Sequence, residues 1–264
     1  MYNTTYHRAS SADEAANLAG SAAEAKYVAG GQTLIPAMKT RLAAPENLID
    51  LRHAGMSGIS QDGDTLTIGA TTTHAEVAGS ETVKKACPGL ASLASHIGDP
   101  HVRHMGTIGG SIANNDPAAD YPSAMVALGA TIVTDKREIA ADDFFTGLFE
   151  TALEEGELVK AVKVPACAAS GYAKFANPAS RYAMTGVFVA KHGDGVRVAV
   201  TGAGSDGVFR WSEAEQALSS NFSADAVSGL KADASALMSD IHASADYRAN
   251  LVAVMTARAV RAIG

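Results

Sequence analysis

Two pairs of adjacent glycines are the residues of this chain whose type and spacing best suit a chemical role. The first pair lies in Ala29-Gly30-Gly31-Gln32-Thr33 and the second in Thr107-Ile108-Gly109-Gly110-Ser111, and each follows an apolar segment. Without a Cβ, adjacent glycines let successive backbone N–H groups turn toward one anion. A hydroxyl beyond each pair, Thr33 or Ser111, can donate a further hydrogen bond. Two such loops facing each other would hold the pyrophosphate of a dinucleotide cofactor without a lysine.

Each loop taken alone is also explained as a tight turn, where glycine is common. Neither loop has the terminal Gly-Lys-Ser/Thr of a phosphate-binding loop, and neither follows the spacing of the Rossmann dinucleotide motif. The glycine pairs by themselves therefore leave both explanations open.

Other residues with catalytic or metal-binding potential form no convincing site. His96, His101 and His104 have a spacing that is not a recognised set of metal ligands. Asp142 and its acidic neighbour are better explained as the start of a helix, and Cys87 is expected to be a small buried residue. We predict no catalytic residue and no metal site. The lack of a general base suits a protein whose redox chemistry belongs to a cofactor.

The bulk properties exclude several classes of function. The chain has 264 residues, enough for a buried core in one or two domains. A net charge of −7 argues against a nucleic-acid partner, because phosphates require a basic surface. No apolar run reaches the roughly 20 residues that span a bilayer, and residues 1–8 lack the apolar core of a secretion signal, so we expect a cytoplasmic protein. An iron–sulfur cluster needs about four thiolates, and this chain has two cysteines, so any cluster must belong to a partner.

The loops are expected to be positioned by a mixture of strands and helices without regular alternation, which favours an α+β fold. Period-2 and period-3.6 patterns of apolar residues separate the two element types. The predicted strands are 26–29, 48–51, 65–69, 131–134, 158–164, 172–175, 187–192 and 196–201, with a hairpin turn at Asp194-Gly195. The predicted helices include 34–42, 121–128, 212–218, 224–238 and 247–263. We divide the chain near residues 57 and 165.

The residues around both glycine pairs resemble the FAD loops of one family, the flavoprotein (medium) subunits of molybdenum hydroxylases. This family includes the medium subunit of carbon monoxide dehydrogenase and corresponds to the central domain of xanthine dehydrogenase. The first match is Ala29-Gly30-Gly31-Gln32-Thr33-Leu34-Ile35-Pro36 and the second runs from Ile97 through Thr107-Ile108-Gly109-Gly110-Ser111 to Asn115-Asp116-Pro117-Ala118-Ala119-Asp120. Tyr172-Ala173-Lys174-Phe175 with Arg181 extends the resemblance into the last third of the chain.

The resemblance implies a two-part FAD-binding domain of the vanillyl-alcohol oxidase (PCMH) type, over residues 1–57 and 58–165. A C-terminal flavoprotein domain, 166–264, would contain a small antiparallel sheet and a helical bundle. It also implies that the loops wrap the FAD pyrophosphate, that Asp120 hydrogen-bonds the cofactor, and that Lys174 lies near the flavin. The implied cofactor-binding residues are Ala29, Gly30, Gly31, Gln32, Thr33, Leu34, Thr107, Ile108, Gly109, Gly110, Ser111, Asn115, Asp116, Asp120 and Lys174.

The function implied by the resemblance is electron transfer within a molybdenum hydroxylase, an oxidoreductase. Electrons from a molybdenum–pterin centre in a large subunit would pass through iron–sulfur clusters in a small subunit to FAD here, and then to an external acceptor. The family assembles as a dimer of heterotrimers. Two alternatives are a stand-alone flavin oxidase or reductase of the same fold and a cofactor-free scaffold that only assembles other subunits.

Overall fold

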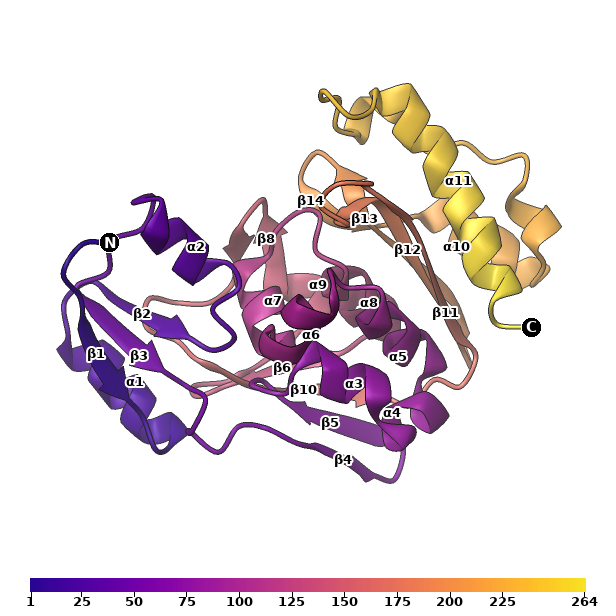
Figure 1. Cartoon of the computed structure of the whole chain (residues 1–264). Helices are drawn as coiled ribbons and strands as arrows, with labels where there is room; N and C mark the ends of the chain where they lie inside the picture. The colour runs from indigo at the N-terminus through magenta and orange to yellow at the C-terminus, as the bar shows by residue number, and fades with distance from the viewer.

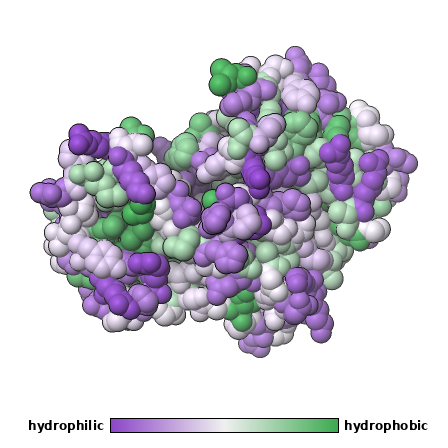
Figure 2. Space-filling model, in the orientation of Figure 1, coloured by the Kyte–Doolittle hydropathy of each residue, from purple (hydrophilic) through white to green (hydrophobic).

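The structure is a computed structural model that describes the whole chain from Met1 to Gly264. Three sheets follow one another along the chain, and a separate short hairpin of β8 (Phe145–Gly147) and β9 (Glu150–Thr151) lies between β7 and β10 in the sequence. Figure 1 shows the first sheet at one end of the molecule and the third at the other. In Figure 2, polar and hydrophobic residues are interspersed over the visible face, and a hollow sets the N-terminal lobe apart from the rest.

The N-terminal part is a small parallel sheet of order β1-β3-β2. Its strands are β1 (Thr5–Arg8), β2 (Ala25–Val28) and β3 (Asn47–Asp50), and they are connected by α1 (Ala12–Ser21) and α2 (Leu34–Lys39). Parallel strands require long connections of this kind, because a tight turn can only reverse the chain. The first glycine pair therefore lies in the turn from the carboxyl end of β2 to α2.

The middle part is an antiparallel sheet of order β4-β5-β10-β6-β7. Its strands are β4 (Ile59–Asp62), β5 (Thr65–Gly69), β6 (Thr131–Thr134), β7 (Glu138–Ala140) and β10 (Val159–Pro165). Between β5 and β6 the chain forms six helices: α3 (His74–Gly79), α4 (Glu81–Ala86), α5 (Pro88–Ser95), α6 (Pro100–Met105), α7 (Ile108–Asn114) and α8 (Tyr121–Leu128). A seventh, α9 (Ala141–Phe144), leads into β8, and the acidic residues expected to start it lie in its first turn.

The C-terminal part is an antiparallel sheet of order β11-β12-β13-β14. Its strands are β11 (Ser170–Ala176), β12 (Ala183–His192), β13 (Gly195–Gly204) and β14 (Gly207–Arg210), followed by α10 (Ser212–Ser220) and α11 (Ala245–Arg261). The long helix α11 packs on β11 and β12, whereas α5 and α8 of the middle part also contact this sheet (Figure 1). Because both faces are covered, β12 is buried without alternation from Ala183 to Ala190.

Three local expectations were wrong. Residues 224–238 do not form one helix but two short 3-10 turns, η1 (Ala224–Val227) and η2 (Ala234–Ala236). The side chain of Asp233 accepts from the N–H of Ser235, and such local bonds compete with a continuous helix. The hairpin turn between β12 and β13 is Gly193-Asp194 and not Asp194-Gly195, because His192 pairs with Gly195. The helix expected over 34–42 ends at Lys39, where the hydroxyl of Thr40 donates to the carbonyl of Pro36.

The hydrophobic core crosses the boundary that we expected near residue 165. One cluster of 30 buried residues contains Leu66 and Met125 of the middle part together with Tyr172, Phe188 and Ala199 of the C-terminal sheet. Each of the three parts has its own sheet, and we propose that they are domains with boundaries near residues 57 and 165. The second and third are then joined by a shared core and not by a flexible linker.

Candidate functional site

The two glycine loops lie against each other. A Cβ built on Gly30 would lie 2.0 Å from the carbonyl oxygen of Met105 and 2.7 Å from the Cα of Gly106. The turn after β2 therefore contacts the chain just before α7, backbone to backbone, across more than 70 residues of sequence (Figure 1). Any side chain at residue 30 would separate the loops.

The first loop offers a run of free hydrogen-bond donors. The backbone N–H groups of residues 30–34 have no hydrogen-bond partner within the chain. Gly31 has a φ of +69°, which favours glycine and lets neighbouring N–H groups converge. The side chain of Thr33 caps nothing at the start of α2, and its hydroxyl is also free. This loop has the geometry of an anion-binding nest.

The second loop differs from the expectation, because its donors are already used. The N–H of Ile108 donates to the carbonyl of Thr72 at 3.1 Å and that of Gly109 to Ala70 at 2.9 Å. Thr107 is the N-cap of α7, and its hydroxyl oxygen accepts from the N–H of Gly110 at 3.2 Å. The prediction of a second nest with free N–H groups is therefore wrong, since the turn is bound to the segment after β5 and continues as a helix.

The two glycines of the second loop have different surroundings. Gly109 is buried, and a Cβ there would lie 2.5 Å from the Cβ of Ala70. Gly110 is exposed, and a Cβ there would meet only the hydroxyl oxygen of Thr107, at 3.0 Å. The hydroxyl of Ser111 has no partner in the chain. Gly110 and Ser111 are thus the residues of this loop that a ligand can approach.

Asn115 has a structural contact that the sequence did not reveal. It ends α7 in the left-handed region with a φ of +41° and is 3% exposed. Its side-chain amide donates to the carbonyls of Gly147 at 2.9 Å and Glu150 at 2.7 Å, at the tip of the β8–β9 hairpin. Asp116 accepts from the N–H of Ala118 at 2.8 Å. Both side chains fix the chain around α7.

Asp120 and Lys174 form a buried ion pair. Lys174 Nζ lies 2.9 Å from Asp120 Oδ1, and the two side chains are 4% and 5% exposed. The hydroxyl of Tyr172 donates to the same carboxylate, and Lys174 also donates to the carbonyl of His96 at 3.1 Å. Burial raises the pKa of Asp120, while the Lys174 cation and the Tyr172 hydrogen bond oppose that rise. Burial beside Asp120 also raises the pKa of Tyr172.

Tyr172 was not predicted as a partner of Asp120. Tyr172 precedes Lys174 by two residues on β11, and residues two apart on a strand share a face. That spacing was a usable signal. The segment of residues 117–120 brings Asp120 to β11. The sequence indicated this segment only as part of the family resemblance and did not predict its contact with β11.

The histidines show no metal site. Nδ1 of His96 lies 2.7 Å from the carbonyl of Ser92, and Nδ1 of His104 lies 2.7 Å from that of Pro100. No group of three or more histidine, cysteine, aspartate or glutamate side chains is close enough to hold a metal ion. Cys87 is fully buried, and burial raises the pKa of its thiol to about 11.

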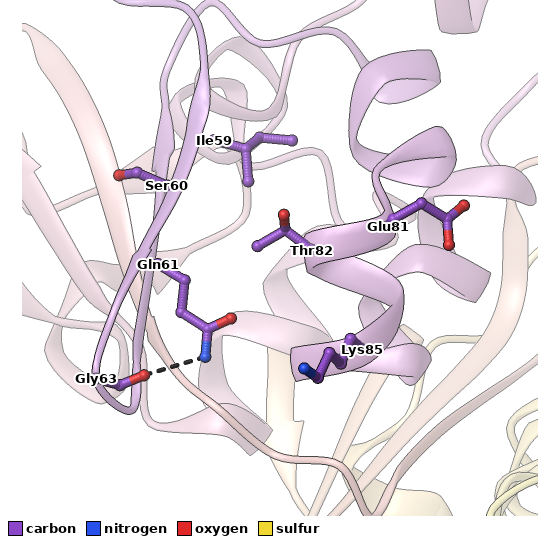
Figure 3. Close-up of a pocket in the computed structure, with 7 residues that line it drawn as sticks. All are labelled: Ile59, Ser60, Gln61, Gly63, Glu81, Thr82 and Lys85. Carbon is purple, nitrogen blue, oxygen red and sulfur yellow. Dashed lines mark hydrogen bonds between the residues drawn. The ribbon is translucent and has the colours of Figure 1, made fainter.

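An open hollow elsewhere on the surface contains none of the predicted site residues. It lies between β4 and α4 and is lined by Ile59, Ser60, Gln61, Gly63, Glu81, Thr82 and Lys85 (Figure 3). The side-chain amide of Gln61 donates to the carbonyl of Gly63 at 3.0 Å, which closes the tip of the β4–β5 hairpin. The hollow shows no cluster of charges comparable to the pair at Asp120.

Comparison with known proteins identifies the family. Residues 2–167 match the family described as the FAD binding domain in molybdopterin dehydrogenase. The chain is 35% identical to the carbon monoxide dehydrogenase medium chain of Hydrogenophaga pseudoflava, with 97% of this chain and 96% of that protein covered. The chain belongs to this family. It is a flavoprotein subunit of an oxidoreductase of the molybdenum hydroxylase type, and its cofactor is FAD.

Further relatives agree over the full length of this FAD-binding chain. The nicotine 6-hydroxylase medium subunit of Paenarthrobacter nicotinovorans is 34% identical, over 97% of this chain and 95% of that subunit. A solved structure of reconstituted CO dehydrogenase from Oligotropha carboxidovorans superimposes with a TM-score of 0.89 at 32% identity, covering all of this chain and 99% of that one. The α+β fold expected from the sequence is confirmed.

None of the helices combines the length and the hydropathy needed to cross a bilayer.

Proposed function

We propose that this chain relays electrons inside a molybdenum hydroxylase, from a small iron–sulfur subunit to FAD and on to an external acceptor. Substrate would be oxidised at the molybdenum–pterin centre of a large subunit, and the complex would be a dimer of heterotrimers. The medium-chain names of the relatives support a multi-subunit assembly. The two buried cysteines support clusters held by a partner.

We propose that the FAD pyrophosphate binds to the free backbone N–H groups of residues 30–34. This run of free donors is the observation on which the proposed binding site rests. Consecutive backbone donors around a left-handed glycine suit a phosphate anion. Gly110 would let the pyrophosphate approach the backbone of α7, and Ser111 would add a hydroxyl donor. Thr107, Ile108 and Gly109 would act by holding that backbone in place.

Lys174 is proposed to lie near the flavin, and Asp120 to act mainly through it. An ammonium group has three donors, and Nζ of Lys174 lies within 3.1 Å of both carboxylate oxygens of Asp120 and of the carbonyl oxygen of His96. When bound, FAD supplies the electron-accepting ring. A cation beside that ring would stabilise its anionic reduced form. Asp120 and Tyr172 would fix where the cation lies.

Gly110→Ala tests the cofactor site with little disturbance of the fold. The added Cβ meets only a hydroxyl oxygen of the protein, but it would enter the space proposed for the pyrophosphate. We expect the dissociation constant for FAD, measured by titration of the whole chain, to rise about tenfold or more. Gly20→Ala is the matched control, because it also lies in a helix and nothing lies within 4 Å of its Cβ. Equal affinity in both variants would contradict the site.

The relay itself is tested by adding the partners in turn. With FAD bound, the isolated chain should oxidise no organic substrate. Its flavin should become reduced under anaerobic conditions only when the large and small subunits and the substrate of the complex are all present. Substrate turnover by the isolated chain would instead favour a stand-alone flavoenzyme.

A further inference from the structure

The segment of residues 117–120, between α7 and α8, has its carbonyl groups bound by the C-terminal sheet. The hydroxyl of Thr201 lies 2.6 Å from the carbonyl oxygen of Ala119 and 3.2 Å from that of Pro117. The N–H of Gly202 donates to the carbonyl of Pro117 at 2.9 Å. Thr201 is 1% exposed, so water cannot replace its hydroxyl at these carbonyls.

The strands that make this contact are themselves tightly fixed. Gly202 has a φ of +78°, and a Cβ there would lie 2.3 Å from the carbonyl oxygen of Ala183. The buried guanidinium of Arg248 on α11 donates to the carbonyls of Gly202 and Met184, and it also binds Asp240 at 2.7 Å. The ends of β12 and β13 therefore form a rigid support for the segment.

The same segment ends at Asp120, whose side chain is also bound by the C-terminal part. Tyr172 and Lys174 of β11 are the partners of its carboxylate. Main chain and side chain are thus both fixed by residues that lie outside the range 2–167 matched by the family. Movement of the segment would displace Asp120 and, with it, the cation of Lys174.

We propose that Thr201 is a positioning residue for cofactor binding. Its hydroxyl holds residues 117–120 so that Asp120 stays paired with Lys174, and the C-terminal part in this way completes the FAD site. This inference rests on the proposed function. Thr201 touches no reacting group and acts only through the segment that it holds.

Thr201→Val removes the hydroxyl and keeps the size of the side chain. Thr201→Ser restores the hydroxyl and serves as the rescue variant. Thr256→Val is the matched control, because Thr256 is also fully buried in the C-terminal part and its hydroxyl also donates to a carbonyl, that of Val252 in its own helix, at 2.7 Å. Each valine variant loses one buried hydroxyl donor.

Three measurements on the whole chain, of FAD affinity, amide hydrogen exchange and melting temperature, separate positioning from stability. Thr201→Val should weaken FAD binding about tenfold and speed the amide hydrogen exchange of residues 115–121, and Thr201→Ser should restore both to near the wild-type values. Thr256→Val should lower the melting temperature by no more than Thr201→Val does, because the carbonyl of Val252 keeps its helical N–H partner, and it should bind FAD with wild-type affinity. The proposal is overturned if Thr201→Val binds FAD as tightly as wild type, or if Thr256→Val weakens binding equally.

The Gly110→Ala variant distinguishes this inference from the site on which it rests. If Gly110→Ala weakens FAD binding and Thr201→Val does not, the positioning role of Thr201 fails while the glycine-loop site stands. If Gly110→Ala binds FAD as wild type does, the glycine-loop site fails and the positioning proposal fails with it.

Discussion

At the scale of single residues, the proposed FAD site combines a neutral run of backbone donors with one buried ion pair. The donors of residues 30–34 suit a phosphate anion, whereas Lys174 and Asp120 compensate each other's charge at 2.9 Å. A buried pair of this kind is costly to break from one side, because the remaining charge has no partner. The function of Lys174 should therefore be tested by the reduction potential of the bound flavin and not by the stability of the protein alone.

Replacing Lys174 with methionine should lower the reduction potential of the bound flavin. Loss of the cation removes the stabilisation of the anionic reduced form, and about 30 mV or more is expected for this two-electron couple. The pKa of Asp120, which burial already raises, should rise further without Lys174. Potentiometric titration measures the shift. Lys136→Met, which breaks an exposed pair with Glu154, is the control and should leave the potential unchanged.

His74 should make the stability of the protein sensitive to mild acid. Burial, with the Arg103 cation as a second cause, lowers the pKa of His74 to about 4 from 6.5. The unfolded chain therefore binds a proton before the folded chain does, and stability is lost as the pH falls from about 6.5 to about 4. The full loss is about 3 kcal/mol.

Denaturant unfolding at several pH values checks this. His74→Phe should remove the loss in that window. Burial raises the pKa of Asp50, but hydrogen bonds from Arg52 and Tyr6 outweigh it and lower the pKa to about 2, so its contribution is lost only below about pH 4. An unchanged slope between pH 6.5 and 4 in His74→Phe would show that His74 is not the group responsible.

At the scale of elements, the sequence predicted those whose signals are local. The helix at Tyr121–Leu128 and the strand at Thr131–Thr134 were predicted with their observed bounds, because Pro122 in the first turn and Gly129 after the last set the helix ends. The helix expected over 224–238 failed because Asp233 prefers local bonds. The close approach of Gly30 to Met105 is a tertiary contact, which no local pattern reports.

The side chain of Asn115 should stabilise the protein by linking the end of α7 to the β8–β9 hairpin. Asn115→Ala removes two side-chain hydrogen bonds and leaves the carbonyls of Gly147 and Glu150 without them. The free energy of unfolding should fall by about 2–3 kcal/mol. Asn114→Ala, in the same helix and without a side-chain hydrogen bond, should change it by less than about 0.5 kcal/mol. If both changes lowered the free energy of unfolding equally in chemical unfolding, the Asn115 hydrogen bonds would not be the cause.

At the scale of the whole molecule, we propose that three parts contribute to one FAD site. The N-terminal part supplies the free donors, the middle part supplies Gly110, Ser111 and Asp120, and the C-terminal part supplies Lys174. The sequence indicated this set through resemblance to a family. The sequence could not show that the backbone N–H groups of the second loop are hydrogen-bonded within the protein. Nor could it show that one hydrophobic core joins the middle and C-terminal parts. Both depend on contacts between residues far apart in the chain.

The proposed FAD site is best tested by a structure of the chain with FAD bound. We expect the pyrophosphate oxygens to lie about 3 Å from the backbone N–H groups of residues 31–34, with the Cα of Gly110 in contact and the flavin ring beside Lys174. A pyrophosphate bound elsewhere, for example in the hollow between β4 and α4, with the donors of the first loop still free, would contradict it.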